Sequence, residues 1–306
     1  MAQRSKPAQQ ARVEVDGRRL TLSNLDKVLY PVSGTTKAEV IDYYARIAPT
    51  MVPHLADRGV TLRRFPDGVA GNSFFEKRCP GHRPQWLGTV LGPGDRNGDI
   101  RYCCLDSAPA LVWAANMAAL EIHAPMARSD IETPTMCVFD LDPGEGTSIE
   151  ECADVALDIR HVLDGFGLTG LPKTSGSKGM QVYVPLNSPH THEQASSFAQ
   201  AIARLLERAR PDNVVSNMNK RLRTGKVFID WSQNSRHKTT IAPYSLRARP
   251  RPTVSTPVMW EEVEATADGD PLTFETADVL DRVDEHGDLF AETLTVEQRL
   301  PDLDEG

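Results

Sequence analysis

The 306-residue sequence has no apolar run of about 18 residues, so a membrane-spanning helix is excluded. Its first twelve residues, MAQRSKPAQQAR, are polar and lack the apolar segment of a signal peptide, and we interpret them as a mobile tail. No internal repeat or low-complexity tract interrupts the rest of the chain. These absences leave a globular protein with one large domain or two small ones.

Cysteine is scarce, with five residues and no C-x-x-C pair. An odd number of cysteines with no C-x-x-C pair argues against a disulfide framework and is more typical of proteins in a reducing cytosol. We therefore expect a cytoplasmic protein. Cys79 and His82 have a C-x2-H spacing that zinc sites use, but the sequence offers no second ligand pair. Buried thiols are the alternative interpretation.

The two signs of charge are separated along the chain. The net charge is −8, but residues 261–306 alone contain 16 acidic and two basic residues, which leaves the rest of the chain at +6. Within that part, Ser216–Arg251 holds nine Lys and Arg residues and a single acid, Asp230. A basic segment of this kind suits a phosphate-rich partner, although a solvated loop explains the charge equally well.

Helical and extended patterns alternate along the chain. Apolar periodicity predicts helices over 36–51, 108–120, 147–164 and 193–208, and strands over 136–141, 180–186 and 226–231. A short extended piece at 121–124 follows the second helix. A Pro-rich passage from about residue 249 leads into the acidic C-terminal segment. The mixture predicts an α/β or α+β fold.

Carboxylates end two of the predicted strands. Asp140 and Asp142 in the segment FDLDPG lie two positions apart, so their side chains share one face about 6.6–6.8 Å apart. Two carboxylates this close repel unless a cation lies between them. Asp230 ends the strand 226–231, so three carboxylates from two strands could hold two divalent cations for phosphoryl transfer. A lone D-x-D could instead simply begin a turn.

A glycine-rich segment lies between the two aspartate strands. Ser175–Gly179 precedes a strand, which distinguishes it from a P-loop, but its backbone amides and Lys178 could still bind phosphate. A flexible turn is the alternative interpretation.

Two N-terminal features suit a polynucleotide. Phe74 and Phe75 follow Arg64, and because adjacent strand residues face opposite sides, we expect one phenylalanine to be exposed for base stacking. Packing of both in the core is the alternative. Lys27 and Lys37 flank a turn and could together hold an exposed phosphate.

Eight segments occur in the order found in a known family: LSNLDKVLYP, GTTK, FFEK, LEIHAP, FDLDPGEG, TSGSKG, LRTGKVFIDWSQN and TTIAPYSLR. On these motifs the chain resembles the polymerase domain of bacterial DNA ligase D, a member of the archaeo-eukaryotic primase superfamily that acts in end joining. The resemblance covers roughly residues 13–290. It implies a mixed α/β primase-type catalytic core with sheets flanking a central cleft, and tails at 1–12 and 291–306.

The resemblance also implies an activity. The protein would be a template-directed nucleotidyltransferase that prefers ribonucleotides and fills short gaps or extends broken ends in non-homologous end joining. It would use two manganese or magnesium ions and NTP or dNTP. Its partners would be DNA carrying a 5′-phosphate, a DNA ligase and Ku, at the bacterial nucleoid.

Three alternatives are considered. One is a stand-alone enzyme that fills gaps in excision repair. Another is a haloacid-dehalogenase-type phosphatase, in which Asp140 would be the nucleophile and Asp142 a general acid. The last is an inactive scaffold for DNA ends.

Individual roles also follow from the resemblance. The implied metal ligands and catalytic residues are Asp140, Asp142 and Asp230. The implied nucleotide-binding residues are His123, Ser175, Lys178 and Arg247. Asn24, Lys27 and Lys37 would hold the 5′-phosphate, and Arg64, Phe74, Phe75 and Arg223 would contact the template or DNA end. One nucleotide-site position departs from the family, because Gln181 stands where a histidine is usual, and glutamine cannot carry a positive charge.

Overall fold

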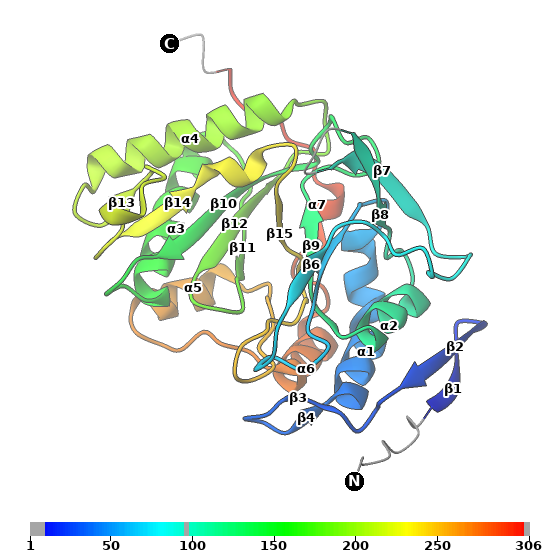
Figure 1. Cartoon of the computed structure of the whole chain (residues 1–306). Helices are drawn as coiled ribbons and strands as arrows, with labels where there is room; N and C mark the ends of the chain where they lie inside the picture. The colour runs from blue at the N-terminus through cyan, green and yellow to red at the C-terminus, as the bar shows by residue number, and fades with distance from the viewer. Residues whose placement is uncertain (1–9, 95–97, 303–306) are drawn as a thin grey trace.

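Two β-sheets form the framework of the computed structural model, which describes residues 10–94 and 98–302 (Figure 1). The five-stranded sheet has the order β11 (Leu171–Thr174), β12 (Met180–Pro185), β10 (Met136–Pro143), β14 (Val227–Asp230), β13 (Val214–Val215). The four-stranded sheet has the order β15 (Thr239–Ile241), β9 (Ala119–Pro125), β5 (Thr61–Arg64), β6 (Phe74–Glu76). The expected mixed α/β core with two sheets is confirmed.

Helices cover the outer side of each sheet (Figure 1). The five-stranded sheet packs against α3 (Ile149–Gly165) and α4 (His192–Ala209), and α5 (Trp260–Ala267) packs on α3. The four-stranded sheet packs against α1 (Lys37–Leu55) and α2 (Ala108–Asn116), with α6 (Thr276–His286) against α1. The space between the sheets is therefore free of these helices.

Short elements complete the described chain. They are the hairpins β1–β2 (Gln10–Val15, Arg18–Ser23), β3–β4 (Val28–Tyr30, Thr35–Thr36) and β7–β8 (Thr89–Pro93, Asp99–Cys103), the 3-10 helices η1 (Lys220–Leu222) and η2 (Trp231–Asn234), and α7 (Glu292–Thr295). The helix starts follow from capping chemistry: Thr36 with Glu39 begins α1, and Ser148 with Glu151 begins α3, each as a capping box.

Side-chain alternation along β10 decides which way the aspartates point. Phe139 and Leu141 pack in the cluster that includes α3 and α4, whereas Val138 packs on the opposite face with Tyr183. Asp140 and Asp142 share the face of Val138 because side chains alternate along a strand. They therefore point into the space between the sheets.

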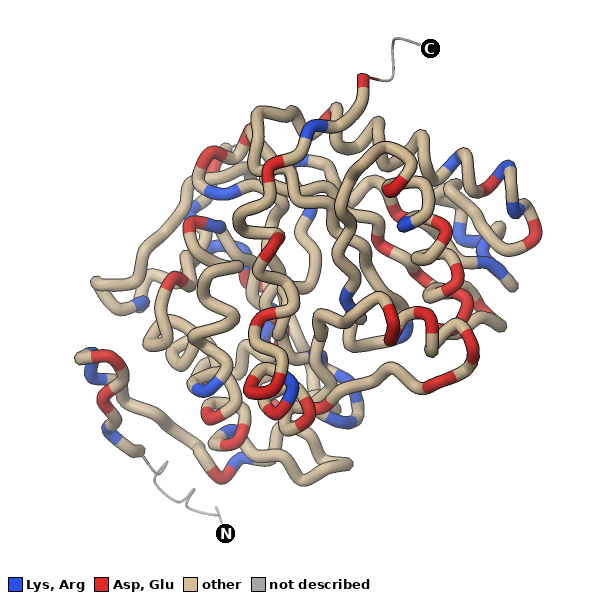
Figure 2. Tube along the Cα trace, turned by 180° about the vertical axis from the view of Figure 1, so that it is seen from behind, with Lys and Arg blue, Asp and Glu red and all other residues tan. Residues whose placement is uncertain are grey.

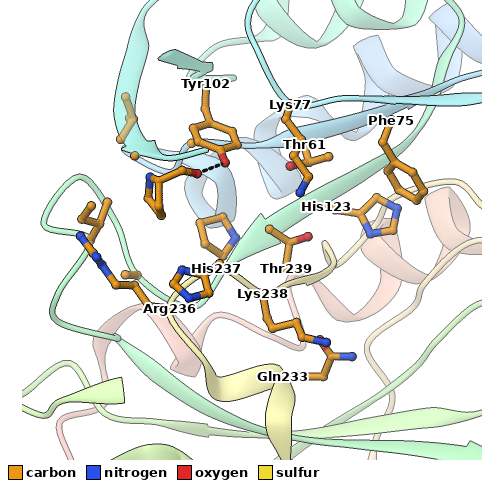
Figure 3. A pocket seen from close by; sticks show the side chains of 17 residues that line it. Thr61, Phe75, Lys77, Tyr102, His123, Gln233, Arg236, His237, Lys238 and Thr239 are labelled. Carbon is orange, nitrogen blue, oxygen red and sulfur yellow. Dashed lines mark hydrogen bonds between the residues drawn. The ribbon is translucent and has the colours of Figure 1, made fainter. Parts of the chain in front are cut away.

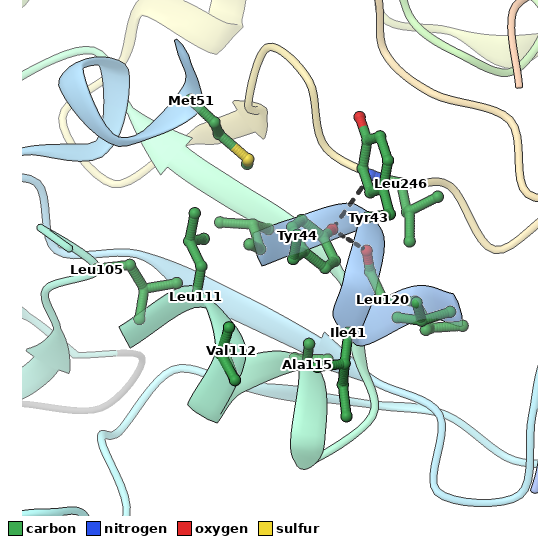
Figure 4. Packing of buried hydrophobic residues seen from close by; sticks show 14 of the residues in the cluster. Ile41, Tyr43, Tyr44, Met51, Leu105, Leu111, Val112, Ala115, Leu120 and Leu246 are labelled. Carbon is green, nitrogen blue, oxygen red and sulfur yellow. Dashed lines mark hydrogen bonds between the residues drawn. The ribbon is translucent and has the colours of Figure 1, made fainter. Parts of the chain in front are cut away.

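A buried tyrosine connects α1 to the segment after β15 (Figure 4). The Tyr44 hydroxyl donates to the carbonyl oxygen of Leu120 at 2.6 Å and accepts from the amide of Leu246 at 3.1 Å. A buried hydroxyl that is satisfied in this way fixes its neighbours in place. The strand β9 and the segment before Arg247 are thus held against the same helix.

Both chain ends differ from the expected tails. Residues 10–12 lie in β1, and residues 1–9 and 303–306 lie outside the described residues. At the C-terminal end, α7 packs on β12, and the Gln298 side chain donates to the carbonyl oxygens of Thr169 and Pro185. The Pro-rich passage is also part of the domain, since Pro257 pairs with Lys173.

The cysteine expectation is wrong for one pair. Cys79 and Cys103 form a disulfide that joins the segment after β6 to β8, whereas Cys104, Cys137 and Cys152 are buried thiols. Because the Cys79 sulfur is bonded to Cys103, the C-x2-H zinc site with His82 does not form.

Acidic residues occur along the segments of α5 and α6 in the view from behind (Figure 2). Among the described helices, none combines the length and apolarity required to cross a membrane.

Candidate active site

Three carboxylates meet at the ends of two adjacent strands. Asp140 of β10 lies directly opposite Asp230 of β14, and Asp142 follows on the same face of β10. Desolvation and the charges of Asp142 and Asp230 raise the pKa of Asp140 to about 7. Desolvation and the charge of Asp230 also raise the pKa of Asp142. The cluster is therefore poorly neutralised by the protein itself, which favours binding of cations.

A row of polar side chains crosses four strands at this level. Strand register pairs Lys173 with Gln181, Gln181 with Asp140, and Asp140 with Asp230. Gln181 is only 3% exposed, and its amide nitrogen donates to Asp140 Oδ1 at 2.8 Å. Lys173 is fully buried, and its ammonium donates to Ser255 Oγ at 2.6 Å. Gln181 thus supports a carboxylate in this structure, where the resemblance implied a contact with the nucleotide.

The carboxylates have the chemistry of a magnesium or manganese site but are not yet arranged as one. Asp230 Oδ1 accepts from the Ser232 amide at 3.1 Å and hydroxyl at 2.6 Å, and its Oδ2 accepts from Gln233 Nε2 at 3.0 Å. No group of three or more His, Cys, Asp or Glu in the described ranges forms a ready metal site. Oxygen ligands suit these hard cations. Rotation of the Asp230 side chain would be needed to complete a site.

A glycine allows the loop 175–179 to touch β10. A Cβ at Gly179 would lie 2.0 Å from the carbonyl oxygen of Leu141, so the loop 175–179 approaches β10 between its two aspartates. In this loop Ser175 Oγ accepts from the amides of Ser177 at 3.3 Å and Gly179 at 3.2 Å, and Lys178 is exposed. The amides expected to converge on a phosphate converge here on a hydroxyl.

Arg247 contacts this loop directly, and Glu121, a residue that sequence reasoning missed, joins His123 to Arg247. Arg247 Nη1 donates to the Ser175 carbonyl oxygen at 2.7 Å, and its Nε contacts Glu121 Oε1 at 3.2 Å. His123 Nε2 lies 3.1 Å from Glu121 Oε2. The only signal for Glu121 in the sequence was its place in LEIHAP.

A cavity of about 370 Å³ opens beside this cluster, between the four-stranded sheet and the segment 233–239 (Figure 3). Phe75, His123 and Gln233 lie along it. Its basic lining residues are Lys77, Arg236, His237 and Lys238, and none of the described lining residues is acidic. Such a surface suits an anionic, base-containing ligand.

Both neighbouring phenylalanines are exposed, where we expected only one. Phe74 is 45% and Phe75 57% exposed on β6, the edge strand of its sheet. The Arg64 guanidinium lies 5.2 Å from the Phe74 ring centre, and Phe75 packs edge-on against His123 at 5.7 Å. The site expected to contact template thus adjoins the cavity.

Basic side chains gather around Lys37. Its ammonium is 5% exposed and donates to the Ser23 carbonyl oxygen at 2.7 Å. Burial and the charges of Lys27 and Arg64 lower the pKa of Lys37 to about 8. Lys27 contacts Asp67 at 2.8 Å, and Asn24 is exposed at the start of the turn with a φ of 55°. The structure therefore brings the expected phosphate-binding lysines together.

The family is decided by the comparisons with known proteins. The sequence profile described as "LigD, primase-polymerase domain" matches residues 36–290. The chain belongs to this family. It is 47% identical over 278 residues to the multifunctional non-homologous end joining protein LigD of Mycolicibacterium smegmatis, covering 89% of this chain and 36% of that protein. The bifunctional non-homologous end joining protein LigD of Bacillus subtilis is 31% identical over 270 residues, covering 88% of this chain and 43% of that protein.

The fold agrees with that assignment. The polymerase domain of Mycobacterium tuberculosis ligase D, solved in complex with DNA, superposes with a TM-score of 0.86 at 43% identity, covering 92% of this chain and 99% of that domain. The chain thus spans well under half of the curated LigD proteins and nearly all of the solved domain. The LigD assignment favours a polymerase over the phosphatase alternative for FDLD.

Arg223 lies close enough to the carboxylates to act on the charge of Asp142. Its guanidinium carbon lies 3.6 Å from the Phe228 ring centre, and its charge lowers the pKa of Asp142. Sequence reasoning named the three aspartates and Arg223, but missed Lys173, Glu121 and Gln233. Unlike the aspartates, none of these three belongs to a pair or set of carboxylates at the end of an apolar run.

Proposed function

We propose that this chain adds nucleotides to DNA primers under the direction of a template, at short gaps or broken ends. The register that places Asp140 opposite Asp230 and beside Asp142 carries this proposal. These three residues would hold the divalent cations, manganese or magnesium. Bound ions would lower the pKa of the attacking hydroxyl and neutralise the triphosphate. The protein itself supplies the carboxylates, with Gln181 and Lys173 fixing the row.

The incoming nucleotide would lie beside the loop 175–179. Ser175, Lys178 and Arg247 would hold its phosphates, because Arg247 already reaches the Ser175 carbonyl oxygen. His123 lines the cavity and would contact the sugar, which makes it our candidate for a ribonucleotide preference. Addition would stop after one or a few nucleotides.

The DNA would be held at two further places. Lys27, Lys37 and Asn24 would bind the 5′-phosphate at the far side of a gap. Phe74, Phe75 and Arg64 would stack against the template where it bends, and Arg223 would position the primer end. The physiological role would be end joining at the bacterial nucleoid, in the cytoplasm, together with a DNA ligase and Ku.

Extension of a duplex with a short gap tests the activity. Wild-type protein with manganese should extend the primer by a few nucleotides, faster with NTP than with dNTP. Replacing Asp230 by Ala should abolish extension and leave DNA binding largely intact, because Asp230 is a metal ligand in this proposal. Extension by Asp230→Ala would overturn the assignment of the metal site, and equal use of dNTP would remove the sugar preference.

Binding of gapped DNA with and without a 5′-phosphate tests the second contact. The terminal phosphate carries more negative charge than an internal diester, so wild-type protein should prefer it. The double variant Lys27→Ala, Lys37→Ala should lose this preference but still extend a primer at high DNA concentration. Equal binding of both gaps by wild type would show that the proposed phosphate pocket does not exist.

A further inference from the structure

One buried carboxylate joins the nucleotide side of the site to the template side. Glu121 of β9 is 2% exposed and receives four donors, from two other parts of the chain and from its own strand. They are Arg63 Nη1 at 3.3 Å, His123 Nε2 at 3.1 Å, Arg247 Nε at 3.2 Å and the Ala248 amide at 3.0 Å. A buried carboxylate with this many donors is strongly fixed in place.

The environment keeps Glu121 ionised. Burial alone would raise its pKa, but the hydrogen bond from His123, the charge of Arg247 and the Ala248 amide lower it to about 2. Glu121 is therefore an anion at neutral pH, and each donor is held by a charge-assisted contact. His123 contacts Glu121 through Nε2. Its other ring nitrogen, Nδ1, makes no contact with Glu121.

The two sides of Glu121 lead to different ligands. On one side, Arg247 reaches the Ser175 carbonyl oxygen at 2.7 Å, in the loop proposed to hold phosphates. On the other side, the Arg63 guanidinium lies 5.3 Å from the Phe75 ring centre and donates to Ser73 Oγ at 3.3 Å. Phe75 also packs against His123. A shift of the template-side strand β6 therefore reaches His123 directly through Phe75, and reaches both His123 and Arg247 through Arg63 and Glu121.

We propose that Glu121 is a positioning residue that couples template contact at Phe75 to nucleotide binding at His123 and Arg247. The coupling rests on the proposed polymerase function and adds to it a means of selecting the nucleotide that matches the template. With the template base stacked on Phe75, Arg63 and Glu121 hold His123 in the orientation that contacts the sugar and Arg247 in the orientation that grips the triphosphate.

The variant Glu121→Gln tests this coupling, because it keeps the side-chain shape and removes the charge. The measurements are KM and kcat for matched and mismatched NTP on gapped DNA, with manganese. Loss of one charge-assisted contact should raise KM for the matched NTP about tenfold. The ratio of matched to mismatched addition should fall, and affinity for the 5′-phosphate gap should stay at the wild-type value.

Arg63→Ala separates coupling from simple loss of nucleotide binding. This variant keeps the contacts of Glu121 to His123 and Arg247 and the direct packing of Phe75 on His123, but removes the link from Glu121 to Phe75 through Arg63. It should lower the matched-to-mismatched ratio while leaving binding of a fluorescent NTP, measured without DNA, unchanged. In the double variant Glu121→Gln, Arg63→Ala, the ratio should fall no further than in Glu121→Gln alone.

Asp288→Asn is the matched control. Asp288 is also a partly buried carboxylate with histidine, tyrosine and amide donors, namely His54 at 2.8 Å, Tyr244 at 2.6 Å and the Phe290 amide at 2.9 Å. The Asp288→Asn variant should be less stable than wild type, but its KM for the matched NTP and its ratio of matched to mismatched addition should stay at the wild-type values. The coupling is overturned if folded Glu121→Gln keeps both wild-type values, or if the two single-variant effects on the ratio simply add. Failure of wild type to extend the primer at all would instead overturn the proposed function.

Discussion

At the scale of single residues, the metal-free site is electrostatically unfavourable. Asp140, Asp142 and Asp230 lie on neighbouring strand positions, and burial together with the charges of their neighbours raises the pKa values of the first two. Gln181 donates to Asp140 but adds no charge. Active sites commonly give up stability in this way for function.

Replacing Asp140 by Asn should therefore stabilise the metal-free protein and abolish nucleotide addition. The amide removes one of three repelling charges and can still accept the hydrogen bond from Gln181. We expect the melting temperature in EDTA at neutral pH to rise by a few degrees, on the order of 1 kcal/mol. Manganese should raise the melting temperature of wild type by mass action and have little effect on the variant.

Asp42→Asn serves as the control for this experiment. Asp42 is an exposed carboxylate on α1 whose nearest cation is Arg46 at 3.9 Å. Its replacement should change neither melting temperature nor activity. A lower melting temperature for Asp140→Asn in EDTA would show that favourable contacts, and not repulsion, dominate at this position.

The lowered pKa of Lys37 should make the proposed recognition of a 5′-phosphate dependent on pH. Its pKa of about 8 lies well below the ordinary value for lysine because of burial and the charges of Lys27 and Arg64. Lys37 is therefore charged below this pH and neutral above it. We expect the preference for a 5′-phosphate over a 5′-hydroxyl gap to fall as the pH rises from about 7 to about 9.

Measured affinities for the two gaps across this range check the prediction. The gap with a 5′-hydroxyl is the control substrate, because the protein's affinity for it should depend only on the DNA contacts other than the 5′-phosphate. Lys37→Met should show the weaker preference at every pH. A wild-type preference that stays constant up to pH 9 would contradict a role for the Lys37 charge.

At the scale of elements, a close contact between two loops positions the aspartates. A Cβ at Gly144 would lie 1.7 Å from the carbonyl oxygen of Arg223, and the Gly144 amide donates to the Lys226 carbonyl oxygen at 2.9 Å. The turn after β10 is thus locked to the loop before β14. This contact fixes Asp142 relative to Arg223.

Gly144→Ala should separate these loops. Overpacking of this kind costs about 1–3 kcal/mol in the free energy of unfolding, and addition should fall further because Arg223 and Asp142 move apart. Urea unfolding and primer extension measure the two effects. Gly165→Ala is the matched control, because no heavy atom counted in the same way lies within 4 Å of a Cβ at this position. It should change neither the free energy of unfolding nor the rate of primer extension. Full activity of Gly144→Ala would show that the loops can adjust.

At the scale of the whole molecule, one covalent link adds to the stability of the fold. The disulfide joins Cys79 and Cys103 across 24 positions of sequence and so anchors the segment that follows Phe74 and Phe75 to β8. A disulfide restricts the unfolded chain as a whole. Its presence also departs from the pattern usual in the cytoplasm.

Reduction should lower the stability of wild type by about 3 kcal/mol, as chain entropy predicts for a loop of this length. Cys79→Ser should melt at the temperature of reduced wild type and should not respond to reductant. Cys104→Ser is the control, because Cys104 is a buried free thiol. Its replacement should lower the melting temperature by the same amount with and without reductant. A wild-type melting temperature insensitive to reductant would show that the pair is not oxidised in solution.

The sequence by itself determined the local features of this protein. Alternation along FDLD set Asp140 and Asp142 on one face of β10, and Thr36 with Glu39 and Ser148 with Glu151 set the starts of two helices. These features depend on residues two to four positions apart, so a strand or helix period is enough to predict them. The motif order also sufficed to indicate the family.

Only the tertiary structure decided which distant side chains support these residues. The row from Lys173 to Asp230 depends on the order and register of four strands, and a shift of one residue would turn each side chain to the other face. Three of the four donors at Glu121, namely Arg63, Arg247 and Ala248, and the Cys79–Cys103 pair likewise come from segments far apart in sequence. Local periodicity carries no information on such pairings, because they are fixed by the packing of the two sheets and their helices.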